Sequence, residues 1–186
     1  MSQYMNLIGK NAKKAALEKI NTKLKNKILS RYVSLLDNEK NSIIKANTKD
    51  IKFALKKGLK NNLIDRLTIN HKKLNNIKDS INKITKLKDP IDNTLEKWSR
   101  PNGLKIKRVS IPIGVIGVIY ESRPNVTSDV ASLCFKSGNA VILKGGSEAI
   151  NTNKILAKLF RKALKENKVN ENFIQFVDSR DRKMVD

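Results

Sequence analysis

The first ninety residues place their apolar side chains at the spacing of one helix face. The pattern runs as far as Gly58, which is typical of a helix end, and restarts after Thr68, a good N-terminal cap. It stops before Asp89-Pro90, because a residue that precedes proline is disfavoured in the helical region. We therefore predict that residues 1–93 form a helical segment. Its apolar stripes are Ile20, Leu24, Ile28 and Leu29, then Ile43, Ile44, Ile51 and Leu55, and finally Leu74, Ile77, Ile81 and Ile84.

Residues 94–111 change to an alternation of apolar and polar positions, as along a strand. Pro101-Asn102-Gly103 lies in the middle of this stretch and suits a tight turn with a positive φ angle. The apolar phase shifts by one residue between Ile106 and Val109, which predicts a β-bulge or a change of neighbouring strand. We predict a β-hairpin on which Trp98 packs. Because a two-stranded ribbon is marginal alone, we expect it to lie against a sheet or a partner chain.

Residues 112–186 alternate three buried-type strands with two helices. The strands read "GVIGVIY", "NAVILK" and "NFIQFV", and the helices begin near Pro124 and Ala149. A β-α-β-α-β order with short connections predicts parallel strands joined by right-handed crossovers. The predicted fold class is therefore α/β, with N-terminal helices, a β-hairpin and the first part of a doubly wound, cofactor-binding sheet.

The chain carries 39 Lys and Arg against 17 Asp and Glu, a net charge of +22, which raises the question of a nucleic-acid partner. Lysine outnumbers arginine 31 to 8, and aromatic residues are only 5%. Nucleic-acid readers use arginine forks and aromatic platforms, so we expect no specific nucleic acid. The lysines are spread along the predicted helices and resemble ordinary solvent-facing positions.

A single cysteine, Cys134, cannot form an internal disulfide and fits a reducing compartment. No stretch reaches the apolar length of a membrane span, and the N-terminus has no signal-peptide apolar block. The basic N-terminus resembles a transit peptide only weakly, and its apolar residues fit a helix face equally well. We expect a cytoplasmic protein without a membrane association.

Ligands of open α/β sheets bind at the carboxyl ends of the strands, which here are the segments "YESRPNV" and "LKGGSEA". We expect the two to lie side by side. Lys144 ends a buried strand, where a cation needs solvent or an anion, and it suits a ribose hydroxyl or a phosphate. Gly145 and Gly146 allow a tight turn and a close approach of backbone to ligand. Ser147 and Glu148 suit either a ribose hydroxyl or simply the start of the next helix.

Arg123 and Asn125 flank Pro124 at the first of these strand ends. An arginine there can bind phosphate or carboxylate, and an amide can stabilise a developing oxyanion, although both residues also suit ordinary turn contacts. Cys134 falls on the buried face of a helix and reads as a core residue rather than a nucleophile. His71 reads as a solvated surface residue, and we expect no metal site. The sequence has no G-x-G-x-x-G motif, so the ordinary dinucleotide fingerprint is absent.

One long segment of the sequence closely resembles the glutamate-5-semialdehyde dehydrogenases, also called γ-glutamyl phosphate reductases. It reads "PIGVIGVIYESRPNVTSDVASLCFKSGNAVILKGGSEAINTN". The segments "IIKANTKDI", "LIDRLT", "KLKDPI" and "FVDSRDR" are similar to the same family at the corresponding places. The resemblance covers essentially the whole chain and implies an N-terminal portion of the aldehyde dehydrogenase fold.

This resemblance implies an enzyme that reduces γ-glutamyl phosphate with NADPH in proline biosynthesis. The family attacks its substrate with a cysteine thiolate and reduces the thioester with hydride. It also implies glutamate 5-kinase as a possible partner and a homo-oligomer, with the hairpin similar to the strands through which subunits associate. Asn125 corresponds to the oxyanion amide, although Arg123 stands where the wider superfamily has its asparagine. The implied cofactor-binding residues are Tyr120, Glu121, Ser122, Arg123, Lys144, Gly145, Gly146, Ser147 and Glu148.

Members of that family are roughly twice as long as this chain, in keeping with a two-domain enzyme. Because the chain is so much shorter, we expect residues 112–186 to form an incomplete NADP-binding sheet. Cys134 does not match the nucleophile's motif, so we expect the catalytic domain to be absent. The expected fragment would be inactive alone, with an open sheet edge and an uncovered apolar face. Three alternatives are half of a split enzyme, a piece of a bifunctional synthase, and a basic binding module without enzymatic activity. Met1 at the first helix argues against the bifunctional synthase.

Overall fold

The computed structural model describes residues 3–181 and confirms the helical N-terminal segment. Two of its helix starts are capped by asparagine: the side chain of Asn21 accepts from the Leu24 N–H at 2.9 Å, and that of Asn70 from the Lys73 N–H at 2.8 Å. Gly58, with a φ angle of 70°, follows the third helix as expected. The five helices are α1 (Gln3–Ala16), α2 (Thr22–Asn38), α3 (Lys40–Lys56), α4 (Asn61–Leu67) and α5 (His71–Lys86).

The prediction that Thr68 caps a helix start was wrong. Thr68 follows the short helix α4, and its hydroxyl donates to the Ile64 carbonyl at 2.7 Å, which closes the end of that helix. Asn70 takes the capping position of α5 instead. The apolar pattern hid α4, because its seven residues are too few to show a helical period, and only Leu67 among them is buried. His71 is exposed at the start of α5, as expected.

The three predicted parallel strands form one sheet in the order β3-β4-β5. Both neighbouring pairs are parallel, with Val115 opposite Ala140 and Val141 opposite Ile174. Gly138, with a φ angle of 71°, lies between helix α6 and strand β4 and ends that helix as expected. The elements are β3 (Val115–Tyr120), α6 (Pro124–Lys136), β4 (Ala140–Gly145), the 3-10 turn Ser147–Ala149, α7 (Ile150–Glu166), the 3-10 turn Glu171–Phe173 and β5 (Ile174–Phe176).

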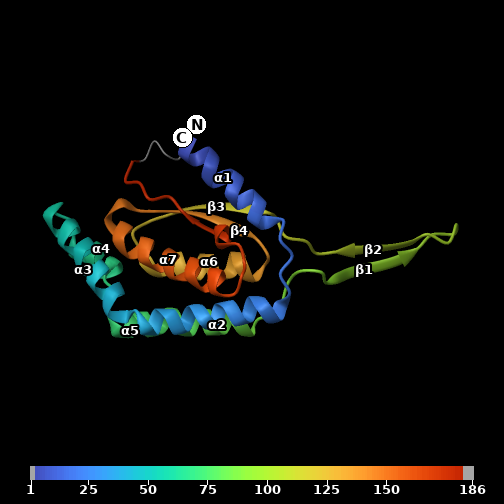
Figure 1. The fold of residues 1–186 in the computed structure, drawn as a ribbon, viewed down its shortest axis with the longest axis horizontal. Coiled ribbons are helices and arrows are strands. Elements are labelled where there is room, and N and C mark those ends of the chain that lie inside the picture. The colour runs from blue at the N-terminus through green and yellow to red at the C-terminus, as the bar shows by residue number, and fades with distance from the viewer. Residues whose placement is uncertain (1–2, 182–186) are drawn as a thin grey trace.

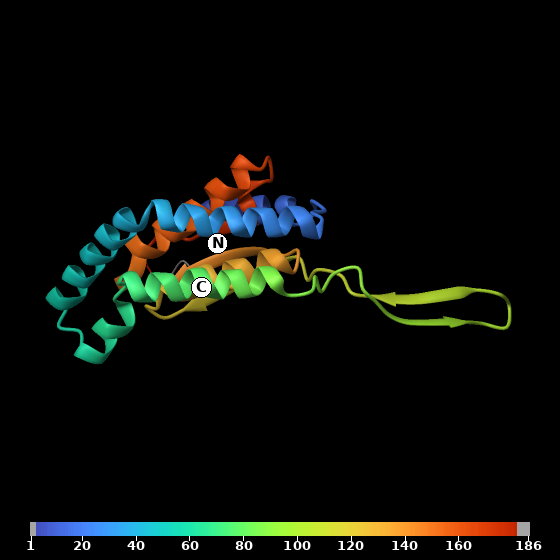
Figure 2. The same cartoon turned by 90° about the horizontal axis from the view of Figure 1, so that it is seen from below.

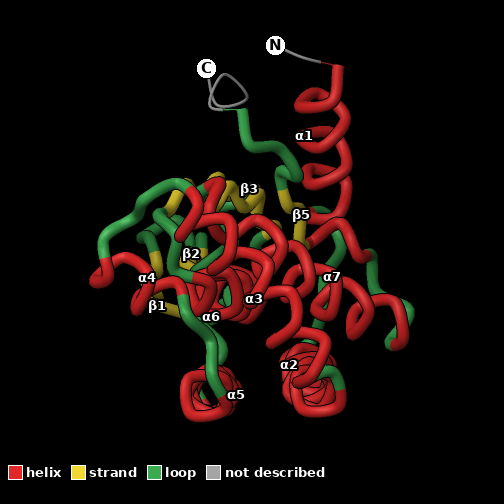
Figure 3. The backbone as a smooth tube through the Cα atoms, turned by 90° about the vertical axis from the view of Figure 1, so that its left-hand side faces the viewer, coloured by secondary structure: helices red, strands yellow, loops and turns green. Residues whose placement is uncertain are grey.

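The elements stack in layers that Figure 1 shows from the side. Helix α1 covers one face of the sheet, mainly over β4, while α6 and α7 cover the other face. Helices α2 and α5 form a further layer beneath α6 and α7, and Figure 3 shows these two helices end-on, side by side. One hydrophobic core joins these helices and the sheet, so the division of the chain at residues 93 and 111 remains a prediction.

An aromatic cluster lies where the helical layers meet. Tyr32 of α2 is fully buried, and its ring stacks on Phe160 of α7 with centroids 4.5 Å apart. Its hydroxyl shares a hydrogen bond of 2.7 Å with the Ser128 hydroxyl of α6. Burial raises the pKa of the Tyr32 hydroxyl, and the bond to Ser128 offsets only part of that rise. The cluster therefore joins three helices through both apolar and polar contacts.

The start of α7 is capped by a residue about a hundred positions earlier in the chain. The carboxylate of Asp50, fully buried in α3, accepts from the backbone N–H of Asn151 at 3.1 Å and of Thr152 at 2.7 Å. It also accepts from the Asn151 amide at 2.7 Å and the Thr152 hydroxyl at 2.6 Å. These four donors and the positive end of the helix stabilise the buried charge.

The predicted hairpin forms its own two-stranded antiparallel sheet of β1 (Thr94–Ser99) and β2 (Lys105–Val109). Its register shifts between Thr94 and Glu96, opposite Val109 and Arg108, which confirms the irregularity expected there. Trp98 stands opposite Ile106 and is 38% exposed. Figure 2 shows the hairpin extending away from the body of the molecule, and none of the described residues supplies the supporting sheet that we expected.

Strand β3 is at the edge of the described sheet, so the prediction that it is a buried-type strand was wrong for this chain. Its residues are half-buried or exposed, and Ile119 is 70% exposed. Ile111 and Ile113, which lead into β3, are 73% and 82% exposed. The open edge expected from the sequence is therefore confirmed, whereas both faces of the sheet carry helices, so the expected uncovered face is reduced to these few side chains.

Candidate functional site

The two strand ends singled out in the sequence lie side by side. Ile119 of β3 stands opposite Lys144 of β4, and Tyr120 stands opposite Gly145, because the two strands run parallel in register. Both strands therefore end at the same edge of the sheet, where ligands of α/β sheets bind. This confirms the expected placement of the two segments.

A cleft of about 830 Å³ opens at this edge, within the range of small-molecule sites. Helix α4 and the loop before it border it with Leu59, Leu63 and Arg66, and Arg180 approaches from the other end of the chain. All nine residues that the sequence predicted for cofactor binding line this cleft, namely Tyr120, Glu121, Ser122, Arg123, Lys144, Gly145, Gly146, Ser147 and Glu148. Their individual roles remain predictions.

The two glycines after β4 allow the strand ends to pack tightly. A Cβ on Gly145 would lie 2.2 Å from the Asn153 amide nitrogen and 3.0 Å from the Tyr120 ring. A Cβ on Gly146 would lie 2.4 Å from the Ser122 hydroxyl and 3.0 Å from the Ser122 backbone nitrogen. Glycine is therefore required for the close approach of one strand end to the other, which forms the floor of the cleft.

Lys144 lines the cleft, although most of its side chain is buried. Its ammonium group donates to the Ser179 carbonyl at 2.6 Å. Burial lowers the pKa of Lys144, and the charges of Asp181 and Glu148 act in the opposite direction. The group thus bonds a neutral carbonyl and lies near two carboxylates, and it lines the cleft where an anionic ligand would meet it.

Glu148 is held between two hydroxyl groups. Its carboxylate accepts from Ser147 at 2.7 Å and from Ser122 at 2.9 Å, and the Lys57 ammonium lies 3.6 Å away. Burial alone would raise the pKa of Glu148, but the hydrogen bonds and the nearby lysine outweigh it and lower the pKa. Glu148 is therefore a carboxylate that can accept a further hydroxyl.

The option that Ser147 caps the following helix was wrong. Its hydroxyl donates to Glu148, and it lies in a 3-10 turn without a side-chain cap. Asp50 provides the cap of α7 instead. The sequence did offer a signal for this contact. Asn47 and Asp50 have the helical spacing that places them on the same face of α3 as the apolar residues Ile43 and Ala54, and that face is buried.

The phenol of Tyr120 faces inward rather than into solvent. It shares a hydrogen bond of 2.6 Å with the Thr127 hydroxyl of α6, which in turn donates to Asn153 of α7. Burial raises the pKa of Tyr120 to about 12, and the bond to Thr127 lowers it only in part. The residue therefore joins the end of β3 to both helices beneath the cleft and remains neutral.

Two arginines of the cleft were missed by the reading of the sequence. Arg66 is exposed on α4, and the guanidinium of Arg180 lies 4.1 Å from the centroid of the Phe53 ring. With Arg123 and Lys144 they make four cations in the cleft, against the two carboxylates of Glu121 and Glu148. The excess of positive charge suits a ligand with several phosphate groups.

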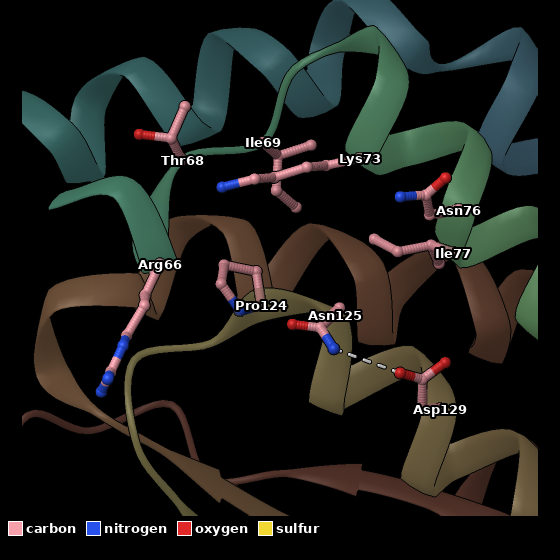
Figure 4. A pocket seen from close by; sticks show the side chains of 9 residues that line it. All are labelled: Arg66, Thr68, Ile69, Lys73, Asn76, Ile77, Pro124, Asn125 and Asp129. Carbon is pink, nitrogen blue, oxygen red and sulfur yellow. Dashed lines mark hydrogen bonds between the residues drawn. The ribbon is translucent and has the colours of Figure 1, made fainter. Parts of the chain in front are cut away.

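Asn125 lies in a second pocket, beside the cleft rather than in it. This pocket, of about 210 Å³, is bordered by the start of α6 and by α4, α5 and the segment between them. Figure 4 shows Asn125 on α6 with its amide directed at Asp129, to which it donates at 3.2 Å. Arg66 borders both spaces. The oxyanion role of Asn125 remains a prediction.

Cys134 is buried in α6 at 8% exposure, as expected for a core residue. Burial raises the pKa of its thiol from 9.0 to about 11. At pH 8 this shift of two units leaves about a hundredfold less thiolate than an ordinary thiol has. The geometry therefore disfavours Cys134 as a nucleophile.

We expect the Cys134 thiol of the folded protein to react with a disulfide reagent at pH 8 at least about fiftyfold more slowly than a cysteine peptide. The rate should rise with pH through the raised pKa, because only the thiolate attacks. Stopped-flow absorbance would measure it, and addition of a denaturant should restore the rate of the peptide. Equal rates for the folded protein and the peptide would show that the thiol is not protected.

Comparison with known proteins places these features in a known context. No family model matches the chain. The curated gamma-glutamyl phosphate reductase of Persephonella marina is 46% identical over 169 residues, 91% of this chain and 38% of the relative. The same enzyme of a Hydrogenobaculum species is 47% identical over 188 residues, 100% of this chain and 43% of the relative. The chain thus spans about two fifths of the length of these curated relatives.

Solved structures give the same result for the fold. The gamma-glutamyl phosphate reductase of Thermotoga maritima superimposes with a TM-score of 0.95 at 38% identity, over 97% of this chain and 44% of that structure. A probable aldehyde dehydrogenase of Listeria monocytogenes shares the fold with a TM-score of 0.68 at 13% identity. Over nearly all of its length the chain is a homologue of gamma-glutamyl phosphate reductase, and it matches the N-terminal part of that enzyme's aldehyde dehydrogenase-like fold.

Proposed function

We propose that this chain provides the NADP(H)-binding part of an enzyme that reduces γ-glutamyl phosphate to glutamate 5-semialdehyde in proline biosynthesis. The observation that carries the proposal is the cleft at the ends of β3 and β4, with its excess of cations and its volume of about 830 Å³. The homology to gamma-glutamyl phosphate reductases supports it. The homology does not favour a basic binding module without enzymatic activity.

The residues of the cleft fit a phosphorylated dinucleotide. Lys144 and Arg180 would face the phosphate groups, the 2′-phosphate of NADPH among them, because both cations line the cleft. Glu148 would accept a ribose hydroxyl, since its carboxylate already bonds two hydroxyls and stays ionised. The cofactor would supply a hydride to the acyl group, and the chain's part is to hold and orient it.

In this proposal the chain alone has no reductase activity. Its single cysteine is buried and protonated, so the thiolate of the family's reaction has to come from residues outside this chain. We place the protein in the cytoplasm, where a lone reduced cysteine is stable. The structure has no helix among the described residues that is long and apolar enough to cross a membrane. Glutamate 5-kinase and a second copy of the chain remain proposed partners.

Titration of the folded chain with NADPH tests the proposal. We expect saturable binding, followed by the fluorescence of the reduced nicotinamide, and weaker binding of NADH because it lacks the 2′-phosphate. Circular dichroism on the same sample would establish that the helices are formed. A folded chain that shows no saturable binding of NADPH at millimolar concentrations would overturn the proposed function.

A further inference from the structure

The second pocket contains opposite charges that its own residues do not neutralise. Its lining includes Arg66 and Lys73 on one side and Asp129 on the other, with the amides of Asn76 and Asn125 between them. Figure 4 shows Asp129 on α6 facing the elements that carry Lys73 and Asn76. At about 210 Å³ the space is a quarter of the neighbouring cleft, so it suits a small head group rather than a nucleotide.

One carboxylate oxygen of Asp129 has no partner. The Oδ2 atom accepts from the Asn125 amide at 3.2 Å, while the Oδ1 atom is buried and has no hydrogen-bond partner among the described residues. A buried carboxylate oxygen left unpaired is costly, and most such atoms in proteins are paired. Because Oδ1 is closed to solvent in this conformation, a donor in the pocket would bond it after a rotation of the Asp129 side chain, and a cationic donor would gain most.

The cations of the pocket are only partly occupied. The Lys73 ammonium donates to the Asp65 carbonyl and lies 3.3 Å from the Asp65 carboxylate, which is 81% exposed and screened by water. Arg66 is exposed and borders both the pocket and the cofactor cleft. Figure 4 shows its guanidinium beside the loop that leads into Pro124. Both groups can accept an anion without losing a buried ion pair.

The carboxylate and the two cations of the pocket together favour a ligand that carries both a positive and a negative charge. A simple anion would be repelled by Asp129, and a simple cation would be repelled by Arg66 and Lys73. A metal ion is disfavoured as well, since no group of three or more possible ligands gathers anywhere in residues 3–181. An α-amino acid head group, with its ammonium and carboxylate on one carbon atom, matches both charges within a small volume.

We propose that this pocket binds the α-amino acid head group of the substrate, with Asp129 accepting from its ammonium group and Arg66 or Lys73 facing its carboxylate. The choice of a glutamate derivative rests on the proposed function. The contact along α6 supports it, since the amide nitrogen of Asn125 lies 3.2 Å from the Asp129 carboxylate, within the length of a glutamyl chain. The α-nitrogen and γ-carbonyl carbon of an extended glutamyl chain are separated by four bonds, about 5 Å. A ligand held at Asp129 thus reaches the amide of Asn125 with its reacting carbonyl.

This assignment gives Asp129 a second task as a positioning residue. The hydrogen bond to its Oδ2 atom engages one N–H of the Asn125 amide and leaves the other N–H free for an oxyanion. Head-group recognition and the orientation of the amide are then joined in one side chain. Truncation of Asp129 would affect both, whereas an amide at position 129 keeps an acceptor for Asn125 and removes only the charge.

The test is an NMR titration of the folded chain with L-glutamate, glutarate and N-acetyl-L-glutamate. Glutarate keeps the five-carbon diacid but has no ammonium group, and the acetyl compound has a neutral amide in its place. We expect L-glutamate to shift the side-chain amide signals of Asn125 and Asn76 with saturation in the millimolar range. Both other ligands should bind at least tenfold more weakly, because Oδ1 gains no cationic donor from them.

Asp129→Asn should remove most of the preference for L-glutamate over glutarate, while the exposed control Asp79→Asn on α5 should keep it. Equal binding of L-glutamate and glutarate by the unchanged chain would overturn the inference without any variant. An absence of saturable binding, or an unchanged preference in a folded Asp129→Asn protein, would overturn it as well.

The NADPH titration on the same sample separates the two proposals. If NADPH binds and L-glutamate is not distinguished from glutarate, only the head-group pocket is wrong. If L-glutamate is distinguished and NADPH does not bind, the pocket stands and the proposed reductase function is wrong. Failure of both titrations in a folded chain would remove both.

Discussion

Replacement of Asp50 by alanine is expected to lower the free energy of unfolding by about 3–5 kcal/mol. The carboxylate is fully buried and accepts four hydrogen bonds from Asn151 and Thr152 at the start of α7. The alanine leaves these donors buried and unpaired and removes the negative charge at the positive end of the helix. Urea denaturation followed by circular dichroism would measure the change.

Asp79→Ala is the matched control for this experiment. Asp79 is an exposed aspartate within α5, so its removal should change the free energy of unfolding by no more than about 0.5 kcal/mol. Asp50→Asn should lie between the two, since an amide keeps one acceptor but places a donor against other donors. A loss below about 1 kcal/mol for Asp50→Ala would show that water replaces the carboxylate at the end of α7.

Lys144→Ala is expected to weaken NADPH binding by about 10–150-fold, which corresponds to a charge-assisted hydrogen bond of 1.5–3 kcal/mol. Lys144 is 8% exposed and lines the cleft, where water screens its charge less than at the open surface. Because the proposed contact includes the 2′-phosphate, the variant should also lose its preference for NADPH over NADH. Fluorescence titration with both nucleotides would measure the two effects.

Lys154→Ala removes the same charge from an exposed position of α7 and should leave NADPH binding within about twofold. The unchanged protein should bind NADPH more weakly as the pH rises, because a neutral amine attracts no phosphate. Burial lowers the pKa of Lys144, so this loss should begin at a lower pH than for an exposed lysine. Equal NADPH affinity of Lys144→Ala and the unchanged protein would exclude the lysine from the site.

The elements around the cleft could be predicted because their signals are local. Apolar runs define β3 and β4, and Gly138 with its positive φ angle marks the end of the helix between them. Parallel order then follows from chain connectivity, and the two strand ends must meet at one edge. The cleft was therefore within reach of the sequence, down to nine of its lining residues, whereas its ligand stays a proposal.

The rest depended on contacts between distant parts of the chain. Arg66 comes to the cleft because α4 packs beside it, and Arg180 because the chain beyond β5 returns to Phe53. Neither has a local pattern that distinguishes it from the many solvent-facing cations of this basic chain. Asp129 could not be predicted for a similar reason. Its unpaired oxygen becomes apparent only in the folded protein, where α5 and α6 border the same pocket.

The position of α1 has a consequence for protein synthesis. Its buried residues are Ile8, Ala12 and Ala15, and they pack on a sheet whose third described strand ends at Phe176, roughly 160 residues later in the chain. At a translation rate of about 5–20 residues per second, some 8–30 s pass between the synthesis of α1 and the synthesis of β5. During that interval the nascent polypeptide exposes an amphipathic segment without its docking surface, which makes α1 a natural target for ribosome-associated chaperones.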